Sequence, residues 1–158
     1  MSTYRISQLI ASTDNFSWKG DVQTIVIDFV NHNDIDESLS QFRSTGFNSG
    51  HSLSLLFENM RGNDLVPVID IYLNLDQEDK SEEKNYVGSM ALYGLGESSA
   101  NDGAGQDRVF DVGEVFSQLH NQPNWSDSQF KLTLIPSRSP NKDALLTIER
   151  IALYYYQL

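Results

Sequence analysis

Apolar residues occupy every second position of the segment VPVIDIYLNLD, at residues 66–76. The alternating apolar positions are Ile69, Ile71, Leu73 and Leu75. Successive side chains of a β-strand point to opposite faces, so this alternation predicts a strand with one face in a core and the other in solvent. Half-buried strands of this kind are typical of antiparallel sheets.

Other segments resemble strands in a weaker form, because they are short, rich in β-branched and aromatic residues, and bounded by turn residues. These segments are 24–30, 53–58, 85–94, 130–136 and 145–156, with residues 3–10 as a further candidate. We therefore expect a mainly β fold, either an antiparallel β-sandwich or a flattened β-barrel, of about six to eight strands.

One segment, at about 111–120, has a helical pattern instead. Apolar residues recur there at spacings of three and four, at Val112, Val115, Phe116 and Leu119. Asp111 and Glu114 have the spacing of a capping box, and Pro123 stops a longer helix. The pattern predicts one short helix over an end of the β structure. Two stretches, 76–85 and 94–107, are expected to be loops, the first charged and the second rich in glycine and serine.

Length and charge restrict the classes of function. A chain of 158 residues fits one domain, here 1–158, and its 22 acidic against 11 basic residues give a net charge of −11. Such a charge disfavours nucleic acid and anionic membranes as partners. The absence of cysteine excludes thiolate metal sites and a cysteine nucleophile. Because residues 1–14 lack an apolar leader, we expect a cytoplasmic protein, with export beside a partner left open.

No set of residues indicates catalysis. The three histidines, His32, His51 and His120, lie in unrelated segments without the spacing of metal ligands. Glycine-rich GLGESS, at 94–99, follows a strand, but we expect more loop after it rather than the helix that a phosphate site needs. The sequence therefore predicts no catalytic, cofactor-binding or metal-binding residues.

Five stretches carry a resemblance to a known family. They are LLFENMRGNDLVPVIDIYLN, NYVGSMALYGLGESSA, VFDVGEVFSQL, FKLTLIPSR and LLTIERIALYY. In this order, residues 51–156 resemble the C-terminal β-domain of the type-3 copper proteins, which include tyrosinases, polyphenol oxidases and mollusc hemocyanins. Residues 1–50 match nothing in this pattern and would form additional strands or an arm.

The resemblance implies a lid rather than an enzyme. In the family this domain covers the entrance to a copper site that a separate helical bundle holds with six histidines, and this chain has three histidines in all. Copper is therefore expected in a tyrosinase-like protein partner, with this chain as a non-enzymatic accessory, lid or chaperone-like domain. The expected partner contacts are Met90, Leu92, Tyr93 and Leu95, although core packing competes with this role for Met90 and Leu92.

Two other classes of function stay open. The chain could be a stand-alone binding module for carbohydrate or small aromatic ligands, with Trp18, Trp125 or Tyr156 as the stacking side chain. It could also be an enzyme whose site forms between copies of the chain, and a homodimer is an alternative to a protein partner of another kind.

Overall fold

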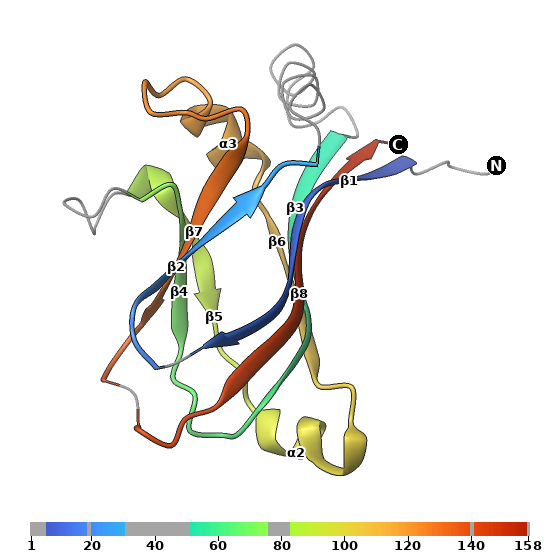
Figure 1. The fold of residues 1–158 in the computed structure, drawn as a ribbon, viewed down its shortest axis with the longest axis vertical. Helices are drawn as coiled ribbons and strands as arrows, with labels where there is room; N and C mark the ends of the chain where they lie inside the picture. Colours follow the sequence, from blue (N-terminus) through green and yellow to red (C-terminus); the bar gives the residue numbers. More distant parts are fainter. Residues whose placement is uncertain (1–5, 19, 31–50, 76–82, 140, 158) are drawn as a thin grey trace.

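The strands form two four-stranded sheets that pack face to face (Figure 1). The computed structural model describes residues 6–18, 20–30, 51–75, 83–139 and 141–157. The first sheet, called the β8 sheet, contains β1 (Ile6–Trp18), β8 (Leu146–Gln157), β3 (His51–Gly62) and β6 (Gln106–Asp111), in that order. The second, the β7 sheet, contains β2 (Gln23–Asp28), β7 (Gln129–Pro136), β4 (Ile69–Leu73) and β5 (Tyr86–Met90). All pairs are antiparallel, which confirms the predicted β-sandwich.

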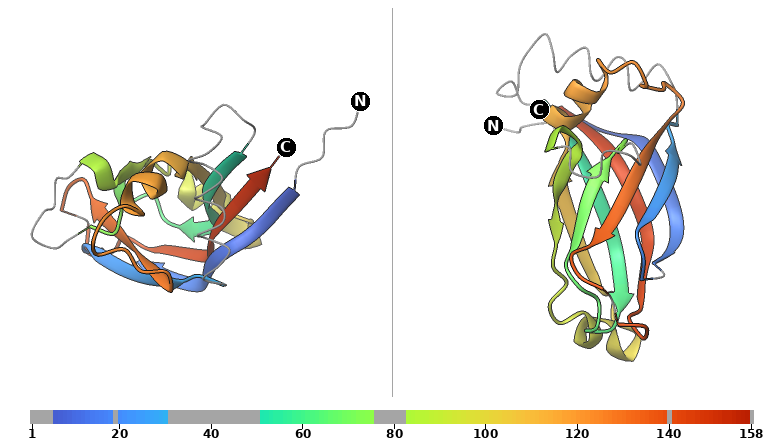
Figure 2. Two further views of the ribbon diagram at one scale, coloured as in Figure 1. Left: turned by 90° about the horizontal axis from the view of Figure 1, so that it is seen from above. Right: turned by 90° about the vertical axis from the view of Figure 1, so that its left-hand side faces the viewer.

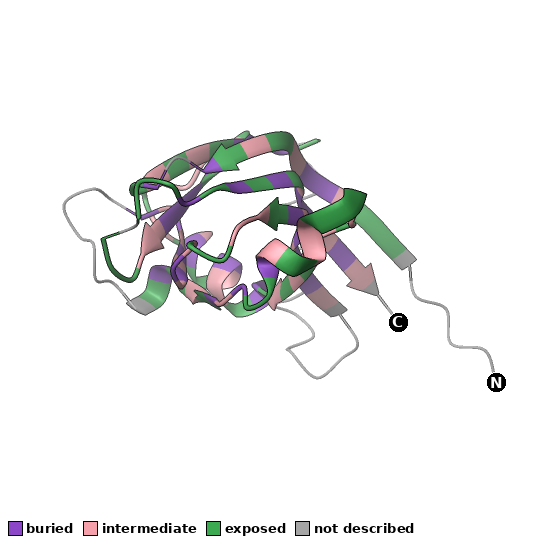
Figure 3. Ribbon diagram, turned by 90° about the horizontal axis from the view of Figure 1, so that it is seen from below, coloured by how far each residue is buried: buried purple, intermediate pink, exposed green. Residues whose placement is uncertain are grey.

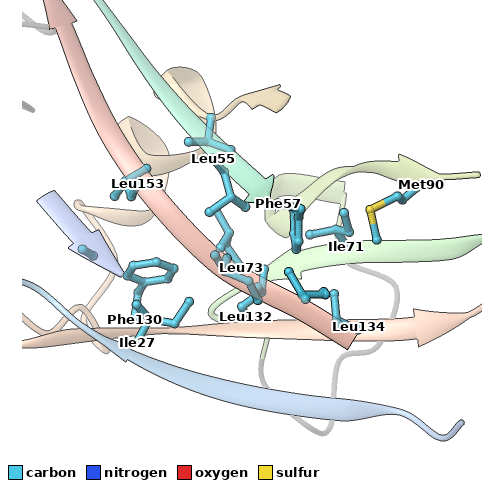
Figure 4. Close-up of a cluster of buried hydrophobic side chains, with 14 of the residues drawn as sticks. Ile27, Leu55, Phe57, Ile71, Leu73, Met90, Phe130, Leu132, Leu134 and Leu153 are labelled. Atoms are coloured by element: carbon cyan, nitrogen blue, oxygen red, sulfur yellow. The ribbon is translucent and has the colours of Figure 1, made fainter. Parts of the chain in front are cut away.

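The core lies between the two sheets and follows the alternation read from the sequence. Ile69, Ile71 and Leu73 of β4 are fully buried, while Asp70 and Tyr72 are half-buried on the outer face. Figure 4 shows how side chains of the two sheets meet, with Leu55, Phe57 and Leu153 from the β8 sheet. Burying each such side chain contributes about 1.5–3 kcal/mol, so this layer holds the sheets together.

The first thirty residues supply one outer strand to each sheet. β1 pairs with β8 along its whole length, with one register shift between Leu9 and Ala11. It ends at Trp18, which is buried and donates its indole N–H to the carbonyl oxygen of Asp21 at 3.0 Å. β2 then crosses to the other sheet and pairs with β7. Residues 31–50 and 76–82, which include most of the charged loop expected at 76–85, lie outside the described residues.

The stretch 94–107, expected to be a loop, contains regular structure. It holds a second helix, α2 (Leu95–Ser99), the 3₁₀ turn η2 (Ala100–Asp102) and the start of β6. The expectation of a single helix was therefore wrong, and so was that of a loop after GLGESS. β6 escaped prediction because its inward positions include Gln106 and Arg108, so its sequence lacks the apolar alternation of a half-buried strand.

The predicted helix is present as α3 (Gly113–Leu119), and it covers the opposite end of the sandwich from α2 (Figures 1 and 2). The carboxylate of Asp111 accepts the backbone N–H of Gly113 at 3.1 Å, which satisfies one free donor at the helix start. Phe116 and Leu119 are buried under this helix. The two ends, called the α2 end and the α3 end, are built differently, and that difference locates the candidate site.

A candidate contact surface at the α2 end

Tyr93 is the most exposed large hydrophobic side chain among the described residues, at 86% exposed. The other three expected contacts are buried: Met90 is 1% exposed, Leu92 is 7% and Leu95 is 0%. Strand β5 directs Met90 inward, and the turn after it places Leu92 and Leu95 in the same core. These three side chains are thus not available at the surface, which leaves Tyr93 as the accessible member of the predicted set.

The turn that carries Tyr93 is held from β6. Gln106 donates its side-chain N–H to the carbonyl oxygen of Tyr93 at 2.7 Å. Arg108 donates to the carbonyl oxygen of Ala91 at 3.1 Å and to the side-chain oxygen of Gln106 at 2.8 Å. Gln106 and Arg108 interrupt the apolar alternation that would have predicted β6, and the same two residues hold this turn in place.

A second support comes from the β3–β4 connection. The carboxylate of Asp64 accepts the backbone N–H of Gly96 at 2.9 Å, at the start of α2. Gly94, between Tyr93 and Leu95, has φ of +72°, a conformation that glycine adopts without strain. Tyr93 therefore projects from a turn fixed on both sides, so any contact made by this side chain would cost little conformational entropy of the backbone.

Two more exposed hydrophobic side chains lie at the same end. Leu65 is 42% exposed and Leu145 is 64% exposed. The side-chain oxygen of Asn63 accepts the backbone N–H groups of both leucines, each at 3.2 Å, and its amide donates to the carbonyl oxygen of Asp143 at 2.8 Å. We call Leu65, Tyr93 and Leu145 the α2-end patch. Figure 3 views the sandwich from this end.

Sequence reasoning missed Leu65 and Leu145. Each is an apolar residue inside a polar turn, in NDLVP and KDALL, where a buried role is not required. That signal could have marked them as exposed, but their proximity could not be read from positions eighty residues apart. Clustered exposed apolar side chains on a folded chain are typical of interaction surfaces.

A pocket of about 530 Å³ opens beside Tyr93. Its walls include Val66, Pro67 and Leu92, and Asp64 and Arg138 add one charge of each sign. This volume lies within the range of about 300–1,000 Å³ that is common for ligand pockets. The α2 end therefore offers both a projecting aromatic ring and an adjacent hollow, a shape suited to contact with another surface.

The described residues do not build a metal centre. No group of three histidine, cysteine, aspartate or glutamate side chains among them could hold a metal ion, so this part of the chain does not fit a copper pair. The ring of His120 packs instead against that of Trp125, with the centroids 5.1 Å apart. In the same described ranges, no helix is long and apolar enough to cross a membrane.

The three aromatic residues considered for ligand stacking, and Tyr154 beside one of them, have other surroundings. Trp18 is buried, as described above. Trp125 is half-buried, and its indole N–H donates to the carboxylate of Asp127 at 2.8 Å. Tyr154 and Tyr156 share one face of β8, with ring centroids 6.0 Å apart and both side chains half-buried. None of these four presents a ring as exposed as that of Tyr93.

Comparisons with known proteins agree with this architecture. Tyrosinase HcTyr1 of Hahella sp. (strain CCB-MM4) is 24% identical over 104 residues, which are 63% of this chain and 22% of that protein. The solved structure of latent aurone synthase, a polyphenol oxidase, matches 89% of this chain and 25% of its own, with a TM-score of 0.58 and 14% identity. Latent apple tyrosinase matches 89% of this chain and 27% of its own, with a TM-score of 0.50 and 12% identity.

This chain spans about a quarter of the length of these relatives. The similarity is to the C-terminal domain of the tyrosinase and polyphenol oxidase proteins, which confirms the resemblance seen in the sequence. The match to 89% of this chain also reaches beyond residues 51–156, to which the sequence resemblance was confined. Residues 7–156 match one family model, so the chain belongs to the family described as a domain of unknown function, DUF7868.

Proposed function

We propose that this chain is a non-enzymatic accessory or lid domain that binds a tyrosinase-like copper protein through its α2-end patch. The exposed ring of Tyr93, on a turn fixed from β6 and by Asp64, is the observation that carries the proposal. Similarity to the C-terminal domain of tyrosinases supports the choice of partner. Copper would belong to that partner.

The physical requirements of such a role are modest. A stable interface buries about 800 Å² on each partner, and a few aromatic anchors usually contribute most of its binding energy. Tyr93 has the form of such an anchor. Leu65 and Leu145, exposed at the same end, would add apolar area to the interface, and the pocket beside Tyr93 would accommodate a side chain of the partner.

The observations favour this function over a stacking-type binding module. A ligand that stacks on a ring needs an accessible ring face, and Trp18 is 3% exposed. Trp125 packs against Phe29 and Phe116, with ring centroids 6.0 and 6.1 Å apart.

The test uses tyrosinase HcTyr1 from which the region that matches this chain has been removed. Its tyrosinase activity is measured while increasing amounts of this chain are added. We expect wild-type chain to lower the activity and Tyr93→Ala to do so only at about 30-fold higher concentration, because loss of a central aromatic anchor costs about 2 kcal/mol.

Tyr154→Ala is the matched control, since it removes a half-buried tyrosine from the outer face of the β8 sheet. It should inhibit like the wild type. The proposal fails if wild-type chain leaves the activity unchanged, or if Tyr93→Ala and wild type inhibit equally while both are folded.

A further inference from the structure

A second cluster of aromatic and charged residues lies on the outer face of the β7 sheet, away from the α2-end patch. The strands of this sheet lie side by side in Figure 2, right. Tyr72 of β4 stands directly opposite Tyr86 of β5, because a register shift in β5 leaves Val87 without a partner. The two rings have centroids 5.3 Å apart at an angle of 55°, and Tyr86 is 40% exposed. A bulge of this kind redirects a side chain, here onto the same face as Tyr72.

A chain of hydrogen bonds fixes a carboxylate beside these rings. Ser89 donates its hydroxyl proton to the Oδ1 atom of Asp70 at 2.5 Å. The hydroxyl groups of Tyr86 and Ser89 lie 2.6 Å apart, so Tyr86 donates to Ser89. The Oδ2 atom of Asp70 forms no hydrogen bond or ion pair with any described residue. Within the described part of the chain, one carboxylate oxygen is thus held by Ser89 and the other accepts no hydrogen bond.

The local field at this cluster is negative. Burial raises the pKa of the Tyr72 phenol above its ordinary value, and the charge of Asp70 and the phenol of Tyr86 raise that pKa further. Lys131 is exposed on the same face, opposite Asn74, but among the described residues no ion pair or cation–π contact joins it to Tyr72, Tyr86 or Asp70. The net charge of −11 adds a longer-range attraction for cations.

We infer that Tyr72, Tyr86 and Asp70 form a docking site for an arginine side chain of a protein partner. A guanidinium group is planar, stacks on tyrosine rings and pairs with a carboxylate through two parallel N–H groups. Val26 of β2 and Val22 just before that strand, at 48% and 50% exposed, lie at the far edge of this sheet, with β7 between β2 and β4. Covering such a flat face requires another protein surface, which a small cation does not provide.

The same tyrosine pair also has a purely structural interpretation, since cross-strand aromatic pairs stabilise sheets. The two interpretations predict different binding affinities. If the pair is only structural, a charged compound and a neutral compound of the same shape should bind equally, whereas a guanidinium site should bind the charged compound more tightly.

The first experiment titrates ¹⁵N-labelled chain with N-acetylarginine amide and with N-acetylcitrulline amide, its neutral counterpart of the same shape, at about 0.15 M salt to screen distant charges. We expect chemical-shift changes at Tyr72, Tyr86 and Ser89, and binding of the arginine compound about fivefold tighter than that of the citrulline compound. N-acetyllysine amide should bind more weakly than the arginine compound. Equal affinity for arginine and citrulline, or for arginine and lysine, would overturn the inference.

Matched variants then locate the site. Asp70→Asn should weaken binding of the arginine compound about fivefold, while Asp28→Asn removes the same charge from an exposed position of β2 and should change it less than twofold. Tyr86→Leu should lose most of the binding, whereas Tyr86→Phe keeps the ring and loses only the hydroxyl that bonds to Ser89, so it should bind more tightly than Tyr86→Leu and no more tightly than the wild type. If Asp28→Asn and Asp70→Asn weaken binding equally, the effect is only net charge and the site is wrong. The comparison of Asp70→Asn with Asp28→Asn remains valid even if Tyr86→Leu does not fold.

The last experiment tests whether the site binds an arginine within a protein surface or a free guanidinium compound. The peptide N-acetyl-Val-Arg-Val-amide should bind about threefold tighter than N-acetylarginine amide, because its valines cover part of the exposed apolar face. Val26→Ser should reduce that gain without changing the affinity for N-acetylarginine amide. A peptide that binds no better than the single amino acid would indicate a site for free guanidinium compounds and would overturn docking of a protein partner.

Discussion

The two ends of the sandwich use a short helix in opposite ways. At the α3 end, the rings of Phe29, Phe116, Trp125 and Phe130 pack together, with centroid distances from 5.3 to 6.1 Å. At the α2 end, polar side chains hold the backbone, and Leu65, Tyr93 and Leu145 are exposed.

This difference would separate the residues that stabilise the fold from those proposed to bind a partner. An end closed by aromatic packing contributes buried area to the core. An end held by hydrogen bonds can expose its apolar side chains on a rigid backbone, which is a favourable arrangement for binding. Substitutions at the two ends should therefore have different consequences.

The largest expected effect is on stability at the α3 end. Phe116→Ala should lower the free energy of unfolding by about 3–5 kcal/mol, because it removes a fully buried ring between Trp125 and Phe130. Urea denaturation followed by tryptophan fluorescence measures this change. A loss below about 1 kcal/mol would mean that the α3 end contributes little to the core, and the contrast between the ends would disappear.

The next effect is on binding at the α2 end. Tyr93→Ala should change the free energy of unfolding by no more than about 0.5 kcal/mol, since its side chain is 86% exposed. The same substitution should weaken binding of the partner about 30-fold. Denaturation and inhibition assays on one preparation test both parts, and a strongly destabilised Tyr93→Ala would show that this residue supports the fold instead.

A smaller effect is expected where the α2 end is held together. Asn63→Ala should lower the free energy of unfolding by about 1–2 kcal/mol, because three backbone groups lose their side-chain partner. Asn124→Ala, at an exposed asparagine near the α3 end, is the control and should be nearly neutral. Hydrogen exchange at Leu65 and Leu145 should accelerate in the Asn63 variant only. Equal exchange rates in the two variants would contradict the role of Asn63.

The smallest effect concerns the face between the two ends. Because the pKa of Tyr72 is raised in the folded state, the neutral phenol contributes stability that is present below pH 10 and is lost as pH rises through the folded pKa. Tyr72→Phe should therefore lose less stability than wild type between pH 9 and about 11.5. Asp70→Asn should lower the pKa of Tyr72 in an ultraviolet titration, and an unchanged pKa would mean that Asp70 does not act on it.

Local pattern predicted much of the fold. The alternation around Ile71 predicted β4, and the spacing around Phe116 predicted α3, because side-chain periodicity follows from the geometry of each element. Similarity to tyrosinase C-terminal domains was visible from the order of the strands. β6 and α2 were missed. In β6, the side chains of Gln106 and Arg108 bond to backbone carbonyls of the α2 end, and only Phe110 packs against the core.

Which apolar side chains are exposed could be established only from the tertiary structure. From sequence, core packing was the competing role for Leu92, but nothing distinguished Tyr93 from Leu95. Only the path of the turn after β5 sends Leu95 into the core and Tyr93 into solvent. Leu65 and Leu145 meet because Asn63 bonds to both, a contact between distant positions that no local pattern contains. Sequence by itself determined most of the segments that become strands, with β6 as the exception, since a strand pattern depends on neighbours along the chain. Which side chains are exposed to solvent depends on how the connections between strands pack. This packing depends on contacts between residues far apart in the sequence, so only the tertiary structure determines it.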